Sequence, residues 1–302
     1  MEPGPLNLDP DQALSGRRGL VEGRRRRLRA RLGDLLDDGA AWLRLVPPRL
    51  GRSAADGRGR VRVLGIYGED HAASMARAVA ELRLSRRQVA ATLGALDDPA
   101  PALADDTLLS GLRPAGKFEN LNALLAEQPL DGEGADWLIA IDDDVELPRG
   151  FLDRFLFLAE RFGLVLAQPA LRRTSHTAWP VFRRERWSVV RATRMVEIGP
   201  LTAFAEPARA ELLPFPPLRM GWGLDSHWGA LALERGWRLG VVDATPIRHE
   251  SRRIAASYDA AEAAEELRSF LRGRPHLDRI TANSVIEKHR SWLGSRYGGR
   301  PR

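Results

Sequence analysis

The stretch Trp137-Leu138-Ile139-Ala140-Ile141-Asp142-Asp143-Asp144 decides the fold. Five apolar residues run directly into three consecutive carboxylates. A continuous apolar run of this kind predicts a strand that is buried on both faces, as in a parallel sheet. In such sheets, ligands bind in the crevice beyond the carboxyl ends of the strands. Acidic side chains at that place are hard oxygen ligands for a divalent cation, which in turn can bind a diphosphate.

The chain around this stretch alternates between strand and helix patterns. Predicted strands cover residues 61–67, 88–96, 137–141, 164–167 and 237–242, with one or two more within residues 187–204. Predicted helices cover residues 72–84, 117–128, 151–162, 224–234, 260–271 and 284–292. This alternation favours the α/β class, with a mostly parallel central sheet flanked by helices. It predicts one domain over residues 61–253, followed by C-terminal helices and a basic tail over residues 254–302.

The composition excludes several kinds of chemistry. The chain has 302 residues and no cysteine, so disulfides, thiolate zinc sites and cysteine nucleophiles are excluded. No apolar stretch reaches the roughly 20 residues that span a bilayer, and the N-terminus lacks the apolar core of a secretory signal. We therefore expect a cytoplasmic location.

Residues 1–60 predict a basic helical extension that ends in a linker. The formal net charge is +6, and much of the excess lies in the arginine-rich run from Arg24 to Arg31. Such a run is commonly a solvated helix face, but it also suits an anionic membrane surface, which would make the protein peripheral at the inner face of the membrane. Nucleic acid ranks last among the anionic partners, because the chain has no recognisable nucleic-acid-binding motif.

Three further motifs contain residues that are suited to catalysis or binding. In Gly221-Trp222-Gly223-Leu224-Asp225, Trp222 offers a flat face for a sugar or base, and Asp225 is a candidate general base at the start of a helix. The second is Ile247-Arg248-His249-Glu250, where His249 could complete a metal site. The third is the helix start at Lys117, which is a natural site for a diphosphate. Each residue has a simpler structural explanation as a helix cap or a surface side chain.

Taken in sequence order, these motifs resemble a glycosyltransferase of the GT-A fold. The order is the Lys117–Asn122 helix, the Trp137–Asp144 strand, the Gly221–Asp225 motif and His249. The segments Leu166–Leu171, Val196–Pro200 and Gly221–Asp225 further resemble an uncharacterised GT-A-like family that is best populated in plants. The resemblance covers residues 61–253 and implies a GT-A-like single domain.

The resemblance implies a hexosyltransferase-like activity with a nucleotide-sugar donor and Mn²⁺ or Mg²⁺. Asp142, Asp144 and His249 would hold the metal, with Asp142 also on the donor side. Asp225 would be the base toward the acceptor hydroxyl in an inverting reaction. The nucleotide-sugar site would also include Lys117 and Trp222, while Tyr67 and Asp97 (or Asp98) would contact the nucleoside because they follow the first two strands. The acceptor could be a glycan, a lipid or a small molecule.

Other functions are consistent with the same residues. A catalytically silent GT-A-like protein could keep the fold for binding or as a scaffold. A nucleotidyltransferase is the nearest enzymatic rival, but it usually has a glycine-rich basic phosphate loop near its first strand. The segment Gly65-Ile66-Tyr67-Gly68 does not supply such a loop.

Overall fold

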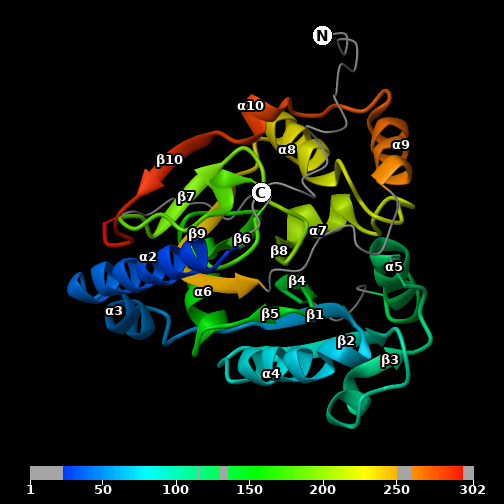
Figure 1. The fold of residues 1–302 in the computed structure, drawn as a ribbon, viewed down its shortest axis with the longest axis horizontal. Helices are drawn as coiled ribbons and strands as arrows, with labels where there is room; N and C mark the ends of the chain where they lie inside the picture. The colour runs from blue at the N-terminus through cyan, green and yellow to red at the C-terminus, as the bar shows by residue number, and fades with distance from the viewer. Residues whose placement is uncertain (1–22, 115, 130–134, 178, 250–259, 295–302) are drawn as a thin grey trace.

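The computed structural model describes residues 23–114, 116–129, 135–177, 179–249 and 260–294. Its centre is one sheet with the strand order β10-β7-β9-β6-β8-β4-β1-β2-β3 (Figure 1). The short strand β5 lies outside this order and pairs with β9. Residues 1–22 of the predicted extension, the predicted boundary at residues 253 and 254, and the tail from residue 295 lie outside the described residues.

One half of the sheet is parallel. Its strands are β1 (Arg60–Tyr67), β2 (Gln88–Ala95), β3 (Thr107–Leu109) and β4 (Trp137–Asp142), which pair in the order β3-β2-β1-β4. The β1–β4 register places Ile66 opposite Asp142. Both strands therefore end at the same edge of the sheet, as parallel pairing requires.

The other half mixes parallel and antiparallel pairs. It contains β6 (Leu166–Leu171), β7 (Val190–Thr193), β8 (Leu201–Ala205), β9 (Leu239–His249) and β10 (Val285–His289). β6 and β9 are parallel, whereas β8, β7 and β10 run antiparallel to their neighbours. The short β5 (Val145–Glu146) pairs antiparallel with the end of β9. The predicted α/β class, with a mostly parallel central sheet flanked by helices, is confirmed.

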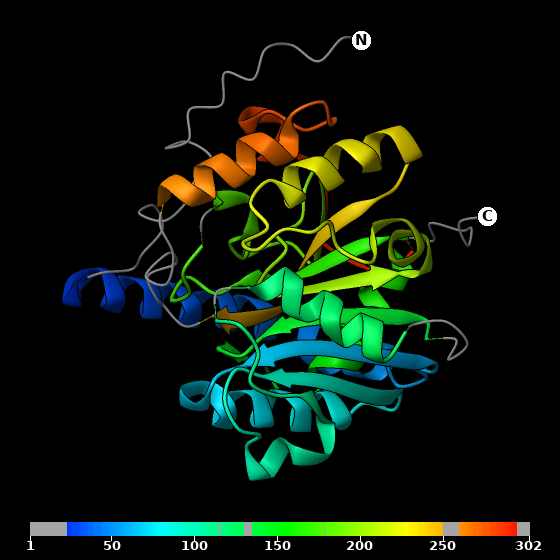
Figure 2. The same cartoon turned by 90° about the vertical axis from the view of Figure 1, so that its right-hand side faces the viewer.

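Helices cover both faces of the sheet (Figures 1 and 2). On one face lie α4 (Ala72–Arg83) and α6 (Phe151–Arg161), and on the other lie α5 (Lys117–Glu127), α7 (Glu206–Leu212), α8 (Leu224–Arg235) and α9 (Ala260–Leu271). Along β4, Ile139 and Ile141 join the first hydrophobic cluster, while Leu138 and Ala140 join the second. Successive strand side chains point to opposite faces, so this one apolar run contributes to both cores.

The N-terminal region forms two helices against the first face. They are α2 (Arg24–Leu43) and α3 (Val46–Ser53), and Leu50 of α3 is fully buried in the same hydrophobic cluster as α6. Among the described residues, no helix has both the length and the apolar character needed to cross a membrane.

The predicted helix over residues 284–292 is wrong, because this segment forms β10 after the short α10 (Arg279–Ala282). Val285 and Ile286 are β-branched and suit a strand. The edge of β7 offers free backbone groups, and the N–H of Val189 donates to the carbonyl of His289 at 2.7 Å. Three short 3₁₀ helices complete the described elements: η1 (Glu69–His71), η2 (Pro101–Asp106) and η3 (Pro180–Phe182).

Candidate metal-binding cleft

A cleft of about 490 Å³ opens where β1 and β4 end. Its walls come from the end of β4, the start of α5, the loop before β8, the loop before α8 and the end of β9. The ionisable residues that line it are Arg113, Lys117, Asp142, Asp143, Asp144, Glu197, Asp225 and His249. The structure thus gathers acids, cations and an imidazole that lie far apart in the sequence.

Strand pairing brings His249 to the acidic motif. β4 ends at Asp142, the chain turns through Asp143 and Asp144, and Val145 of β5 then pairs with His249 of β9. As a result, one ligand atom from each of Asp142, Asp144 and His249 lies within 4.8 Å of the others. Two carboxylates and one imidazole form a donor set that suits Mn²⁺, and the carboxylates suit Mg²⁺. The residues therefore fit the metal that the sequence motifs imply.

Asp144 and His249 form a buried ion pair, with Oδ1 of Asp144 3.0 Å from Nε2 of His249. Burial acts to raise the pKa of Asp144, but the hydrogen bond and charge of His249 outweigh it and lower the pKa below its ordinary value. Burial acts to lower the pKa of His249, yet Asp144, Asp142 and Glu197 raise it overall. The negative potential that favours the imidazolium here would equally favour a bound cation.

Asp142 faces Lys117 on the other side of the cleft. Its Oδ1 lies 2.5 Å from Nζ of Lys117, which also donates to the carbonyl of Ile198 at 3.2 Å. A Cβ at Gly199 would lie 2.9 Å from Oδ2 of Asp142 and 3.2 Å from Nζ of Lys117. Glycine at this position therefore lets the loop before β8 approach the carboxylate and the lysine.

Asp143, the middle carboxylate, points elsewhere. Its Oδ2 accepts a hydrogen bond from the N–H of Gly68 at 3.0 Å. Burial raises the pKa of Asp143, and the neighbouring charges of Asp142 and Asp144 raise it further, although Gly68 opposes them. Asp143 therefore ties the acidic turn to the end of β1 and does not belong to the three-residue ligand set.

Asp225 stands at the start of α8 on another wall of the cleft. Its Oδ1 accepts from the N–H of Ser226 at 2.8 Å. Burial nevertheless raises the pKa of Asp225 to about 6. A carboxylate with this pKa is ionised at neutral pH and remains basic enough to accept a proton from a bound hydroxyl.

The loop before α8 is held from two sides. Glu266 of α9 accepts hydrogen bonds from the backbone N–H groups of Arg219, Met220 and Gly221. Gly221 has φ +78°, and a Cβ there would lie 2.0 Å from the ring of Phe118. These contacts fix the positions of Trp222, which lines the cleft, and of Asp225.

Asn122 of α5 also supports this region. Its side chain donates to the carbonyl of Phe215 at 2.8 Å and accepts from the N–H of Phe215 at 2.9 Å. α5 therefore holds the segment that leads into the Gly221–Asp225 motif.

Glu197 is a cleft residue to which the sequence analysis assigned no role. Its Oε2 is buried and has no hydrogen-bond partner among the described residues. Burial raises the pKa of Glu197 to about 8, with Asp225 and Asp142 raising it further and His249 and Lys117 opposing them. One feature of the sequence could have indicated this residue: Glu197 is the single acid in the otherwise apolar segment Met195–Ile198, directly before Gly199 and Pro200.

Tyr67 and Asp97 do not line this cleft. Tyr67 is buried, and its hydroxyl lies 2.8 Å from the hydroxyl of Thr107 and accepts from the N–H of Ala100. Asp97 accepts from the N–H of Glu69 at 3.0 Å. Their contact with a nucleoside stays a prediction, whereas the other predicted site residues all meet in the cleft: Lys117, Asp142, Asp144, Trp222, Asp225 and His249.

Comparisons with known proteins give similarity to solved structures at low identity and with TM-scores below 0.5. No family model and no curated protein matches the chain. Among solved structures, GalNAc-T7 with UDP, GalNAc and Mn²⁺ is 12% identical with a TM-score of 0.48, over 64% of this chain and 44% of that one. This chain therefore spans under half the length of that structure.

Two further solved structures are similar to the same degree. The mannosyltransferase PcManGT from Pyrobaculum calidifontis, in complex with GDP-Man and Mn²⁺, is 15% identical with a TM-score of 0.46, over 85% of this chain and 78% of that one. S. aureus TarS 1–349 with UDP-GlcNAc is 10% identical with a TM-score of 0.49, over 70% of this chain and 65% of that one.

Proposed function

We propose that this protein is a metal-dependent, GT-A-like glycosyltransferase that moves a sugar from a nucleotide-sugar donor to an acceptor hydroxyl. The observation that carries the proposal is the meeting of Asp142, Asp144 and His249 within 4.8 Å, in a cleft that Asp225 also lines. A cation site and a separate proton acceptor can together support sugar transfer from a diphosphate leaving group.

Asp142, Asp144 and His249 would hold Mn²⁺ or Mg²⁺, which when bound offsets the negative charge that develops on the leaving diphosphate. Lys117, which pairs with Asp142 from the N-terminus of α5, adds a positive charge next to the metal ligands. Trp222 offers an aromatic face for the sugar or the base.

Asp225 takes the proton from the acceptor hydroxyl in this scheme. The acceptor oxygen forms a bond to the anomeric carbon while the bond from that carbon to the diphosphate breaks. A base that acts directly on the acceptor favours inversion of the anomeric centre. The raised pKa of Asp225, about 6, suits this role at neutral pH.

The test is turnover of a panel of nucleoside-diphosphate sugars with and without Mn²⁺, in the wild type and in Asp144→Asn. The matched control is Asp105→Asn, which changes an exposed aspartate outside the cleft lining. We expect Mn²⁺-dependent turnover in the wild type and the control, and its loss in Asp144→Asn. Equal turnover in all three proteins would contradict the metal assignment.

The same assay separates the alternatives. A catalytically silent scaffold would show neither turnover nor Mn²⁺-stimulated donor binding by calorimetry. A nucleotidyltransferase would release pyrophosphate from a nucleoside triphosphate, whereas a glycosyltransferase releases a nucleoside diphosphate. The buried Asp144–His249 ion pair favours the glycosyltransferase over a silent scaffold. Burying charged groups is energetically costly, and a protein that serves only as a scaffold would gain nothing from it.

A further inference from the structure

The helix α2 binds to the rest of the protein through its polar face. Asp34 accepts from the N–H of Arg173 at 2.8 Å and from the hydroxyl of Thr174 at 2.8 Å. Asp37 is fully buried and accepts from Nε of Arg173 at 2.8 Å and from Nε of Arg186 at 2.6 Å. The carboxylates that would normally face water therefore face the protein.

The opposite face of α2 is apolar and exposed. It carries Leu28, Leu32, Leu35, Leu36, Trp42 and Leu43, whose exposed fractions lie between 51% and 87%. With 3.6 residues per turn, these side chains fall within roughly 120° of arc. Figure 2 shows α2 lying along the outside of the molecule. Such a contiguous apolar stripe marks an interaction surface, since isolated exposed leucines would not align in this way.

Cations border this stripe near the start of α2, and the one acid beside it, Asp38, is only partly exposed. Arg24, Arg25, Arg29 and Arg31 are exposed and, by the same helical geometry, flank the leucine face near the start of the helix. The third acid of α2, Asp38, is paired with Arg172 at 2.9 Å and with Arg184 at 2.6 Å. An apolar face with a basic border, whose one adjacent acid is already paired with arginines, is the pattern of a helix that lies in a membrane interface.

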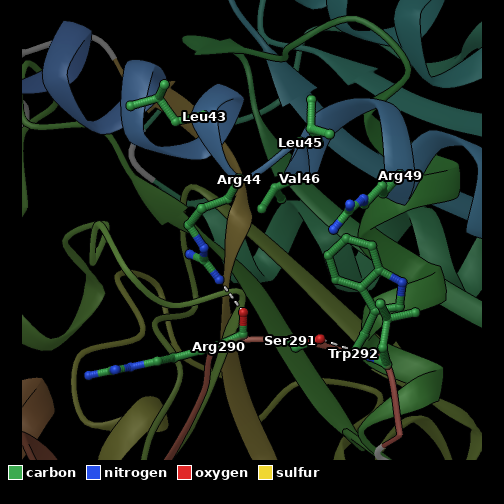
Figure 3. A pocket seen from close by; sticks show the side chains of 9 residues that line it. Leu43, Arg44, Leu45, Val46, Arg49, Arg290, Ser291 and Trp292 are labelled. Carbon is green, nitrogen blue, oxygen red and sulfur yellow. Dashed lines mark hydrogen bonds between the residues drawn. The ribbon is translucent and has the colours of Figure 1, made fainter.

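An open pocket of about 390 Å³ lies at the end of α2, and Leu43 of the stripe is among its lining residues (Figure 3). Its apolar lining includes Leu43, Leu45 and Trp292, and its cationic lining includes Arg44 and Arg49. In Figure 3 the guanidinium of Arg49 lies beside Trp292, and Arg44 donates to the carbonyl of Arg290. Apolar and guanidinium groups side by side suit the acyl–phosphate boundary of a phospholipid.

We propose that α2 docks this protein on an anionic lipid bilayer, with the leucine face in the interface and the arginines on lipid phosphates. A second copy of the chain fits less well, because the one acid beside the outward face of α2, Asp38, is already paired with arginines of its own chain. Nucleic acid would use the arginines but not the leucines. The proposal does not depend on the transfer reaction, so the two can fail separately.

The test is co-sedimentation of the full chain with vesicles of phosphatidylcholine alone or of phosphatidylcholine mixed with phosphatidylglycerol, because a negative surface potential attracts polybasic segments. We expect binding to the anionic vesicles, weakened at least tenfold by Leu32→Gln/Leu36→Gln. We also expect Arg25→Gln/Arg29→Gln to weaken that binding and to reduce its dependence on salt.

The matched control is Leu84→Gln/Ile280→Gln, which removes two apolar side chains elsewhere that are more exposed than Leu32 and Leu36, and it should bind as the wild type does. Unchanged thermal unfolding of all variants excludes a folding defect. The proposal is overturned if the wild type stays in the supernatant with both vesicles, or if the leucine and control variants bind equally. It is also overturned if the wild type is a dimer that the leucine variant dissociates, or if it prefers an oligonucleotide and is insensitive to the leucine changes.

Discussion

His249 places its Nε2 3.0 Å from Oδ1 of Asp144, and this distance results from the pairing of β5 with the end of β9. The acidic turn alone is a local feature of the sequence after β4. It becomes a three-residue donor set only because an antiparallel bridge sets Val145 opposite His249. The relationship ties the proposed chemistry to the sheet topology, and the predictions below test its parts.

His249→Ala should weaken Mn²⁺ binding. Loss of the imidazole removes one of three donors and leaves Asp144 without its buried partner. We expect an affinity loss of at least roughly tenfold, because even outer-shell partners of metal ligands contribute about 10- to 100-fold. Calorimetric titration of Mn²⁺ measures it, with His276→Ala as the control outside the cleft lining. An unchanged affinity would remove His249 from the site.

Turnover should rise with pH through about 6. Asp225 can accept a proton only when ionised, and burial raises its pKa to about 6. Activity should therefore be low at pH 5, rise as Asp225 loses its proton, and reach a plateau above pH 7. Asp225→Asn should lower kcat by about 10²- to 10⁴-fold, the usual contribution of a general base. A pH–rate profile checks both, and a residual acid limb near pH 6 in Asp225→Asn would assign the titration to another group.

Glu197→Gln should stabilise the metal-free protein at high pH. The pKa of Glu197 is about 8 in the folded protein and near its ordinary 4.5 when unfolded. The folded state thus binds more protons between these values, so the free energy of unfolding of the wild type falls as pH rises from 4.5 to 8. At pH 8 we expect the free energy of unfolding of Glu197→Gln to exceed that of the wild type by on the order of 1 kcal/mol or more.

Urea unfolding in EDTA at pH 5 and pH 8 measures this difference. Glu127→Gln changes an exposed glutamate and should leave the pH dependence of stability unchanged. If Glu197→Gln and the wild type lose stability equally between the two pH values, Glu197 is ionised in the folded protein.

Gly221→Ala should destabilise the protein more than Gly163→Ala. Both glycines have positive φ, +78° and +62°, so both substitutions carry a backbone strain of about 1 kcal/mol. Only at Gly221 does the new Cβ also meet the Phe118 ring, at 2.0 Å, whereas nothing lies within 4 Å at Gly163. Thermal unfolding compares the two variants, and a larger loss at Gly163 would mean that the loop before α8 relaxes freely.

The sequence predicted the parts of the fold that depend on local patterns. The apolar run of β4, the helix starts at Lys117 and Leu224, and the strand that leads to His249 follow from periodicity and from glycine stops. The helix predicted over residues 284–292 was wrong, because Val285 and Ile286 form a strand only by pairing with the edge of β7.

Glu197 and α2 show why the remaining features could not be predicted. Glu197 faces Asp142, Asp225 and His249 across the cleft, and the sequence around it gives no sign of these distant neighbours. The aspartates of α2, and not its leucines, face the protein because they meet arginines from residues 172–186. In both cases a partner distant in sequence decides the environment.

The most direct test of the central claim is an anomalous-difference map from crystals soaked with Mn²⁺ and a nucleoside diphosphate. We predict a manganese peak at coordination distance, about 2.0–2.3 Å, from an oxygen of Asp142, an oxygen of Asp144 and a nitrogen of His249, with the diphosphate on its open side. A peak on other residues, or a diphosphate bound elsewhere with these three side chains unliganded, would contradict the account.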